Sequence, residues 1–260
     1  MTEDGEAFPS PARDAAVLGD LVARERRAPG TALRAFPPDG PDRTYSYRDL
    51  ATIAWKAGNF LRYLGVRGAR EAADPDDSGR VVEVAPDPLP EPVATVLGAA
   101  LLGAVVRLDP RGDGAARATV VHADDQGAFD PPPGTKLAVY GGEPARPGVE
   151  HWETAVWSEN PRVHPATVEP GDAAILAGSR YAHRDLLGAA RGVVDSLSLA
   201  AGDRVAVRAS LADPRAVVAG VLAPLLAGGT VVLPDEEARG TVAVGGGPEP
   251  RALALDDVEL

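Results

Sequence analysis

The sequence contains no cysteine, and this absence excludes several kinds of chemistry. Without thiols the chain has no disulfide, no thiolate nucleophile and no metal site built on cysteine. Aromatic residues are also scarce, at 5%, although hydrophobic residues as a whole make up 45%. We therefore expect a core of ordinary size that is built mainly from Ala, Val and Leu.

Long apolar runs and a basic leader are absent as well. No stretch of 18 apolar residues occurs in the 260-residue sequence, which argues against a membrane-spanning helix. The N-terminus, Met1 to Asp4, is acidic and lacks the basic-then-apolar order of a signal peptide. We expect a cytoplasmic protein with no membrane association.

Positive charge is in short supply. The formal net charge is -12, and Lys56 and Lys136 are the two lysines. Nucleic acid is an unexpected partner for such a chain, because phosphate binding needs clustered lysine and arginine. Acidic excess with little lysine and many small residues is typical of halophilic proteins, since concentrated salt screens surface repulsion. We interpret the acidity as an adaptation to a salt-rich habitat rather than as a sign of a particular partner.

The hydrophobic pattern alternates between strand and helix periods. The clearest helix begins after Ser46, whose side chain and that of Asp49 form a capping-box pattern, and it ends at Gly65. Apolar residues at helical spacing lie between these points. A weak pattern covers residues 141–171. Further helices are predicted at 15–27, 92–102, 184–197 and 214–226, and strands at 80–84, 104–108, 118–122, 136–140, 173–176, 204–207, 230–233, 241–244 and 252–255.

An internal repeat, called here the internal echo, indicates two related halves. Leu97 to Leu108 matches Leu222 to Leu233 in residue type along its length. Chance similarity between small-residue units is the alternative explanation. Strands that alternate with helices favour mainly parallel sheets with right-handed crossovers. The expected fold is therefore α/β, with two similar lobes of mainly parallel sheet flanked by helices: an N-terminal segment at 1–41, a first lobe at 42–160 and a second at 161–260.

Six segments spread along the chain match short motifs of one enzyme family in the same order. They are Thr44–Leu50 ("T-Y-x-E-L"), Leu64–Val66 ("L-G-V"), Val81–Pro86 ("V-A-I-x-x-P"), Ala99–Pro110 ("G-A-V-x-x-x-L-D-P"), His183–Leu187 ("H-x-N-L") and Leu222–Leu233 ("L-x-P-L-L-x-G-A-T-V-V-L"). Together they resemble the N-terminal half of the adenylate-forming superfamily, which includes acyl-CoA synthetases, luciferases and peptide-synthetase adenylation domains. The resemblance runs from about residue 42 to residue 234 and implies the two-lobed fold of that half. No segment is a catalytic signature, so the match depends on their number and order.

The sequence departs from the family where ATP would bind. The family's loop "T-S-G-T-T-G-x-P-K-G" cradles the ATP phosphates with backbone N–H groups and hydroxyls. A shortened stretch stands in its place, and the resemblance implies that Gly178, Ser179, Arg180 and His183 are its remnant nucleotide-binding residues. The family's "Y-G-x-T-E" and "T-G-D" segments are not found, and no lysine follows Lys136 that would match its C-terminal catalytic lysine. We therefore expect no catalytic residue, no metal site and no resident cofactor, and we lean against an enzyme.

Other candidate sites are weaker. Gly245 to Gly247 precede Pro248 rather than a helix, so a hairpin-like turn is favoured over a phosphate loop. His122 stands near Asp124 and Asp125, which could suggest metal or acid/base chemistry, but solvated charges at the end of a strand are the favoured explanation.

Three functions remain open. The favoured hypothesis is a truncated AMP-dependent synthetase/ligase-like protein, a non-catalytic pseudoenzyme that binds a small acyl or nucleotide ligand or a protein partner. One alternative is a divergent acyl-adenylating enzyme that needs a second subunit. The other is a structural remnant without a ligand. The sequence names no particular partner.

Overall fold

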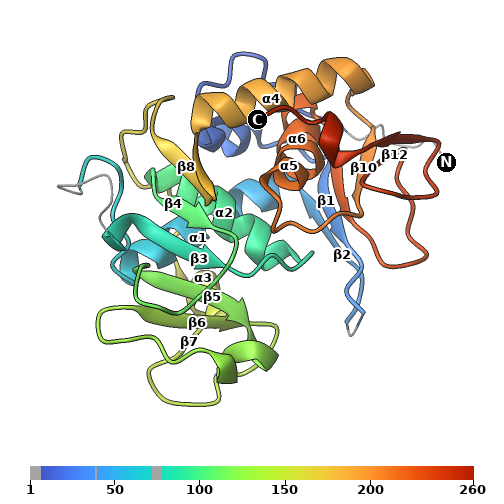
Figure 1. Ribbon diagram of the computed structural model, residues 1–260. Helices are drawn as coiled ribbons and strands as arrows, with labels where there is room; N and C mark the ends of the chain where they lie inside the picture. The colour runs from blue at the N-terminus through green and yellow to red at the C-terminus, as the bar shows by residue number, and fades with distance from the viewer. Residues whose placement is uncertain (1–6, 39, 72–77) are drawn as a thin grey trace. The chain divides into compact units, whose positions relative to one another are not determined.

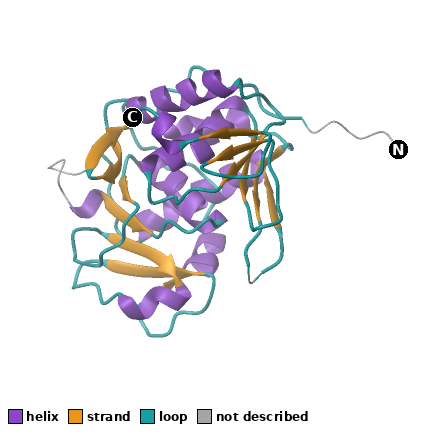
Figure 2. Ribbon diagram, turned by 45° about the vertical axis from the view of Figure 1, so that its right-hand side comes forward, coloured by secondary structure: helices purple, strands orange, loops and turns teal. Residues whose placement is uncertain are grey.

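The computed structural model describes residues 7–38, 40–71 and 78–260, which form two compact units with one sheet each (Figure 1). Unit 1 combines residues up to Ala51, residues 88–90 and residues 185–260; unit 2 combines residues 52–87 and 91–184. Both sheets are mainly parallel and flanked by helices, as the strand and helix colours of Figure 2 show, so the predicted α/β class is confirmed. Among the described residues, no helix has the length and apolarity needed to cross a membrane.

Unit 1 contains a six-stranded sheet, sheet A, with the order β13-β12-β10-β11-β1-β2. β1 pairs in parallel with β11, and β2 is the antiparallel strand at one edge. Helix α4 (His183–Leu197) leads into this unit. A second helix begins as α5 (Pro214–Val217), widens into a π-helical turn (Val218–Leu222) and ends as α6 (Ala223–Ala227). The strands are β1 (Thr31–Ala35), β2 (Arg43–Ser46), β10 (Arg204–Val207), β11 (Thr230–Leu233), β12 (Val242–Val244) and β13 (Arg251–Leu253).

Unit 2 contains a seven-stranded sheet, sheet B, with the order β7-β6-β5-β3-β4-β8-β9. β9 is its one antiparallel strand and lies at an edge. The unit's helices are most of α1 (Tyr47–Tyr63), α2 (Pro90–Leu102) and α3 (Trp152–Ser158). The strands are β3 (Val81–Val84), β4 (Val105–Arg107), β5 (Ala118–His122), β6 (Lys136–Tyr140), β7 (Glu150–His151), β8 (Ala173–Ala177) and β9 (Ser179–Ala182).

The internal echo corresponds to the same local structure in each unit. In unit 2 the chain runs β3-α2-β4, and in unit 1 it runs β10-α5-α6-β11; in both, the two strands are parallel neighbours. Gly103 and Gly228 end the respective helices with φ of +70° and +83°. Glycine reaches this left-handed region without steric cost, so the chain turns sharply from helix into strand.

The predicted capping box forms at the start of α1. The backbone N–H of Asp49 donates to Ser46 Oγ at 3.1 Å, and the backbone N–H of Ser46 donates to Asp49 Oδ2 at 3.1 Å. Two of the N–H groups that a helix start leaves unpaired are thus satisfied. The expected apolar positions of this helix are all buried: Leu50, Ile53, Ala54, Ala57, Phe60, Leu61 and Leu64.

Small residues allow two helices of unit 2 to approach closely. A Cβ added to Gly98 of α2 would lie 2.7 Å from the backbone nitrogen of Gly58 and 2.9 Å from the carbonyl oxygen of Ala54, both on α1. Backbone contact at this distance is possible because neither glycine carries a side chain. The core is otherwise built mainly from Ala, Val and Leu, as the composition predicts.

Several local predictions are wrong. In place of a helix at 15–27 there are two 3-10 segments, Leu18–Val22 and Arg24–Arg26, because Ala23 between them has extended dihedral angles. The turn at 245–248 does not form a hairpin, since β12 and β13 pair in parallel. Strands β1, β2, β7 and β9 and helix α3 had not been anticipated.

The units also differ from the predicted segments 1–41, 42–160 and 161–260. β1 lies within the first segment but pairs with β11 of the last, and β8 and β9 lie in the last but extend the sheet of β3 to β7. Pairing between distant strands leaves no trace in local periodicity, which is why the boundaries fall elsewhere.

Candidate functional site

The segment that resembles the family's phosphate loop forms a tight β-hairpin. β8 and β9 pair antiparallel with Ala177 opposite Ser179 and Leu176 opposite Arg180, so Gly178 alone makes the turn. Its φ is +69°, in the region that favours glycine. β8 is held on its other side by parallel pairing with β4, which fixes the hairpin to sheet B.

The structure brings three of the four predicted site residues together. Gly178, Ser179 and Arg180 are exposed at the tip of the hairpin. His183 is the first residue of α4, at the base of the hairpin, and it is fully buried. Its backbone N–H donates to the carbonyl oxygen of Asp172 at 3.1 Å, which closes the base. The imidazole therefore lies away from the solvent that bathes the tip.

The hairpin tip does not fit a nucleotide triphosphate in the manner of the family loop. That loop surrounds the phosphates with several hydroxyls, a lysine and a run of backbone N–H groups. Here the tip offers one hydroxyl, on Ser179, and one guanidinium, on Arg180. Both flanking strands use backbone groups to pair with each other, so these groups are not directed at a ligand.

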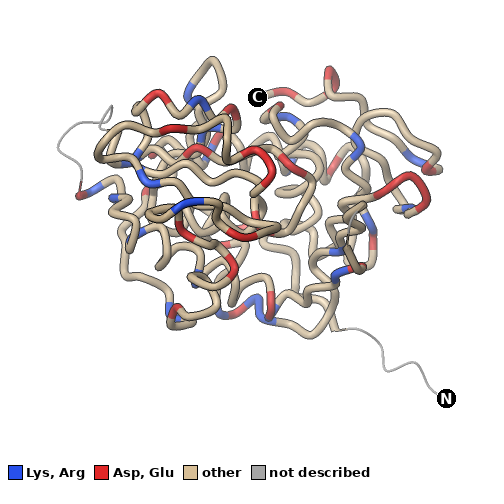
Figure 3. Tube along the Cα trace, turned by 90° about the horizontal axis from the view of Figure 1, so that it is seen from below, with Lys and Arg blue, Asp and Glu red and all other residues tan. Residues whose placement is uncertain are grey.

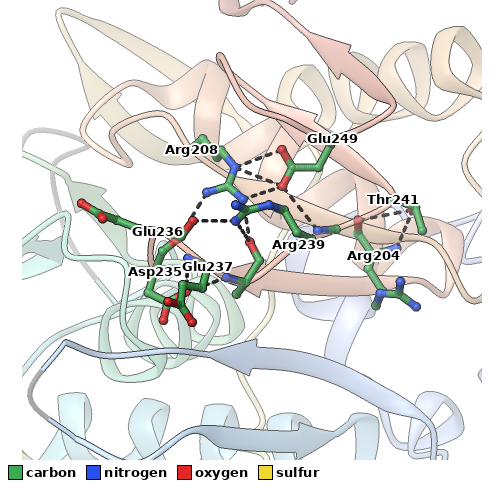
Figure 4. Close-up of polar contacts among 10 residues, drawn as sticks. Arg204, Arg208, Asp235, Glu236, Glu237, Arg239, Thr241 and Glu249 are labelled. Carbon is green, nitrogen blue, oxygen red and sulfur yellow. Dashed lines mark hydrogen bonds and ion pairs between the residues drawn. The ribbon is translucent and has the colours of Figure 1, made fainter.

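A second polar cluster lies in unit 1 (Figure 4). The Arg208 guanidinium donates through Nε to both carboxylate oxygens of Glu249 at 3.0 Å, and through Nη2 to Oε1 at 2.6 Å. It also donates to the carbonyl oxygens of Asp235 and Ala238. These hydrogen bonds lower the pKa of Glu249, whose side chain is fully buried. Because the guanidinium is used on the chain's own groups, the cluster ties two loops together and is no ligand site.

Unit 2 has a comparable buried carboxylate, Glu83 on β3. Its oxygens accept from Arg107 Nη1 at 3.0 Å, from Thr119 Oγ1 at 2.8 Å and from the backbone N–H of Gly112 at 3.1 Å. These donors come from two neighbouring strands and from the loop after β4. The carboxylate is satisfied by the protein, as a buried charge must be.

A buried tyrosine is another polar group that sequence reasoning missed. The Tyr140 hydroxyl at the end of β6 donates to Asp87 Oδ2. Burial, followed by this carboxylate, raises the pKa of Tyr140 far above its ordinary value, so the phenol stays protonated. Its ring meets the His122 ring edge-on. Within the described ranges, no group of three or more His, Asp or Glu side chains is arranged to hold a metal ion.

Comparison with solved structures identifies the architecture. The anthranilate CoA ligase AuaEII in complex with anthranoyl-AMP matches with a TM-score of 0.71 and 20% identity over 88% of this chain and 49% of that chain. A Brucella canis acyl-CoA synthetase matches with a TM-score of 0.68 and 19% identity over 83% and 42%. The N-terminal domain of FACL13 from Mycobacterium tuberculosis matches with a TM-score of 0.68 and 15% identity over 88% and 62%. The chain has the fold of the adenylate-forming enzymes.

The likeness is one of fold, since the identities are low. No protein-family model matches the sequence, and no curated protein matches it. The chain spans about half the length of the first two structures, at 49% and 42%. The solved structures therefore confirm the fold that the six sequence segments predicted.

Proposed function

We propose that this chain is a non-catalytic relative of the adenylate-forming enzymes that acts as a binding module for a small ligand or a protein partner. The hairpin at Gly178 is the observation that supports the proposal. A single residue turns the chain where the family has a phosphate-binding loop. Stabilising the transferring phosphoryl group requires several preorganised donors around it. A hydroxyl and a guanidinium at an exposed tip are too few for this task.

The shape of the hairpin does not depend on the length of the chain. The hairpin is internal to the sequence, between α3 and α4, and lies within the part of the chain that matches the fold, so its geometry would be the same in a longer protein. If a second subunit completed an adenylating enzyme, that subunit would have to supply nearly all the hydrogen-bond donors and positive charges that surround the ATP phosphates.

Two measurements on the wild-type chain test the proposal. The first is the melting temperature with ATP and Mg²⁺, AMP or acyl-CoA, in low and high salt. A ligand at a hundred times its Kd adds about 2.7 kcal/mol to the unfolding free energy, which is a shift of several degrees. The second is pyrophosphate release with ATP, Mg²⁺ and a panel of carboxylic acids. We expect no shift with ATP and no pyrophosphate above a protein-free blank.

A matched variant sharpens the result. Ser179→Ala combined with Arg180→Ala removes the two side-chain donors of the hairpin tip. If the wild type releases pyrophosphate and this variant does not, the proposal is overturned and the hairpin is part of a divergent adenylating site. A shift with AMP or acyl-CoA alone supports a ligand-binding module.

A further inference from the structure

A groove on unit 2, remote in sequence from the hairpin, combines exposed aromatic surface with acidic side chains. It has a volume of about 450 Å³ and lies where α1 meets β7 and α3. Tyr63, at the end of α1, lines it and is 68% exposed. We call this groove, lined by Phe60, Tyr63, Glu150, His151, Thr154, Ala155, Ser158 and Glu159, the α1–α3 groove.

The aromatic side chains exposed at and beside the groove, Tyr63 and Trp157, contrast with the rest of the molecule. Aromatic residues are rare in this chain, and the other two tryptophans, Trp55 and Trp152, are buried. Trp157 is 64% exposed and belongs to the same helix as the lining residues Ala155 and Ser158. Large aromatic side chains left in solvent beside a groove are typical of interaction sites.

The charge of the groove favours a cation. Glu150 and Glu159 line it, and neither carboxylate has an ion-pair partner within the part of the chain that the structure describes. His151 is held by Thr154, with Nδ1 2.9 Å from Oγ1. The lining set contains no lysine or arginine. A positively charged group would therefore meet two carboxylates that the chain leaves uncompensated.

Trp157, the neighbour in sequence of the lining residue Ser158, already receives one cation from within the chain. Lys56 Nζ lies 5.5 Å from the ring centroid of Trp157 and donates to the carbonyl oxygen of that residue at 2.7 Å. Lys56 is one helical turn before Phe60, on the stripe of α1 that also carries Tyr63. The Tyr63 ring stacks beside buried Phe60 and offers a second aromatic surface of the kind that attracts ammonium and guanidinium groups.

We propose that the α1–α3 groove binds a segment of a partner protein that carries lysine or arginine beside aliphatic side chains. The cationic groups would meet Glu150, Glu159 and the face of Tyr63, and the aliphatic groups would cover the aromatic surface. The groove holds about as much as a few side chains, which suits a short segment rather than a folded domain. This inference goes beyond the proposed function, because it holds whether or not the hairpin binds a nucleotide.

The test uses a labelled ten-residue peptide of alternating Lys and Leu and a second peptide of alternating Glu and Leu, with binding followed by fluorescence anisotropy at low and physiological salt. We expect the Lys-containing peptide to bind and the Glu-containing peptide not to bind. Glu150→Lys with Glu159→Lys should weaken binding about tenfold. Tyr63→Ala should weaken it about threefold.

A matched control separates the groove from the general acidity of the chain. Glu236→Lys with Glu237→Lys changes the net charge by the same amount on exposed residues of unit 1. We expect this variant to bind the Lys-containing peptide as the wild type does. Equal losses in the two charge-reversal variants would overturn the proposal, and so would spermine binding as tightly as the peptide.

Trp157 provides a local readout. Because Trp55 and Trp152 are buried, acrylamide quenching of the tryptophan emission reports mainly on Trp157. The bound peptide should reduce quenching in the wild type and leave it unchanged in Trp157→Phe. Binding without protection of Trp157 would place the peptide elsewhere and overturn the proposal. Melting temperatures of all variants, measured in parallel, verify that each is folded.

Discussion

At the scale of single residues, the buried ion pair between Arg208 and Glu249 has a clear structural role. The Glu249 side chain is fully buried and that of Arg208 is 13% exposed. Removing one partner of such a pair leaves an uncompensated buried charge. Arg208 directly follows β10, and it holds the loop after β11 through Asp235 and the loop after β12 through Glu249.

We predict that Glu249→Ala lowers the free energy of unfolding by about 3 kcal/mol. Urea denaturation followed by circular dichroism measures the change. Glu237→Ala, at an exposed position of the neighbouring loop, is the control and should fall within about 0.5 kcal/mol of the wild type. A loss no larger than that of the control would mean that the ion pair is not formed in solution.

The carboxylate of Glu249 also makes the free energy of unfolding depend on pH. Hydrogen bonds from Arg208 hold the pKa of Glu249 below its ordinary value of 4.5. A lowered carboxyl pKa contributes stability that is present above the ordinary value and is lost as the pH falls through the folded-state value. We predict that the difference in stability between wild type and Glu249→Gln narrows as the pH is lowered below about 4.5. Denaturation curves from pH 7 to pH 3 test this, and a gap that widens in acid would contradict it.

At the scale of elements, glycine has opposite roles in two helices. A Cβ at Gly98 in α2 would press on backbone atoms of α1, which cannot give way cheaply. A Cβ at Gly188 in α4 would meet nothing within 4 Å. The same substitution therefore tests close packing in one place and helix propensity in the other.

We predict that Gly98→Ala destabilises the protein by about 2 kcal/mol through overpacking. Gly188→Ala should stabilise it by about 0.5 to 1 kcal/mol, because alanine is the better helix former. Thermal denaturation of the two variants provides the comparison. If Gly98→Ala stabilises the protein as Gly188→Ala does, α1 and α2 are not in contact at Gly58 and Gly98.

The turn of the β8–β9 hairpin gives a third prediction at this scale. Gly178 has a φ of +69° and open space where a Cβ would be, so backbone strain is the sole cost of a side chain. We expect Gly178→Val to cost about 1 to 2 kcal/mol and Gly178→Asn clearly less, since asparagine tolerates this conformation. Equal effects of the two substitutions on the melting temperature would argue against the left-handed turn.

Elements differ in how far the sequence could predict them. Helix α1 could be predicted in full, because its capping box and apolar stripe are local signals between Ser46 and Gly65. Strand β1 could not, since its stability depends on pairing with β11, far along the chain. β9 was missed because Ser179 and Arg180 show no alternating pattern and form a strand only by pairing with β8.

The candidate site was predictable in part for the same reason. The family resemblance located the hairpin in the chain and indicated that its loop is short. It could not show that Gly178 alone makes the turn, or that His183 is buried while its neighbours at the tip are exposed. The buried carboxylates Glu83 and Glu249 gave no signal at all, because their partners come from other strands and loops.

At the scale of the whole molecule, the dominant property is charge. The net charge is -12, and Figure 3 shows acidic residues spread along the chain rather than gathered in one segment. Like charges so distributed repel one another in the folded state at low ionic strength. We interpret this as adaptation to high salt.

We predict that the melting temperature rises by several degrees between about 0.05 and 1 M KCl, because the Debye length falls from more than 10 Å to about 3 Å. Replacing four exposed Asp or Glu residues by Asn or Gln should reduce the response. Calorimetry at matched pH measures both. A melting temperature independent of KCl would contradict the interpretation.

The pairing of β1 with β11 has a consequence for the order of events during synthesis. Residues 91–184, together with 52–87, make unit 2, so every strand of sheet B has been synthesised before the ribosome reaches β10. Sheet A must wait: β1 and β2 are already made and can pair with each other, but β1 still lacks β11, its neighbour on the other side. The nascent chain is thus expected to complete unit 2 first, while β1 and β2 remain accessible to chaperones until the last quarter of translation supplies the other strands of sheet A.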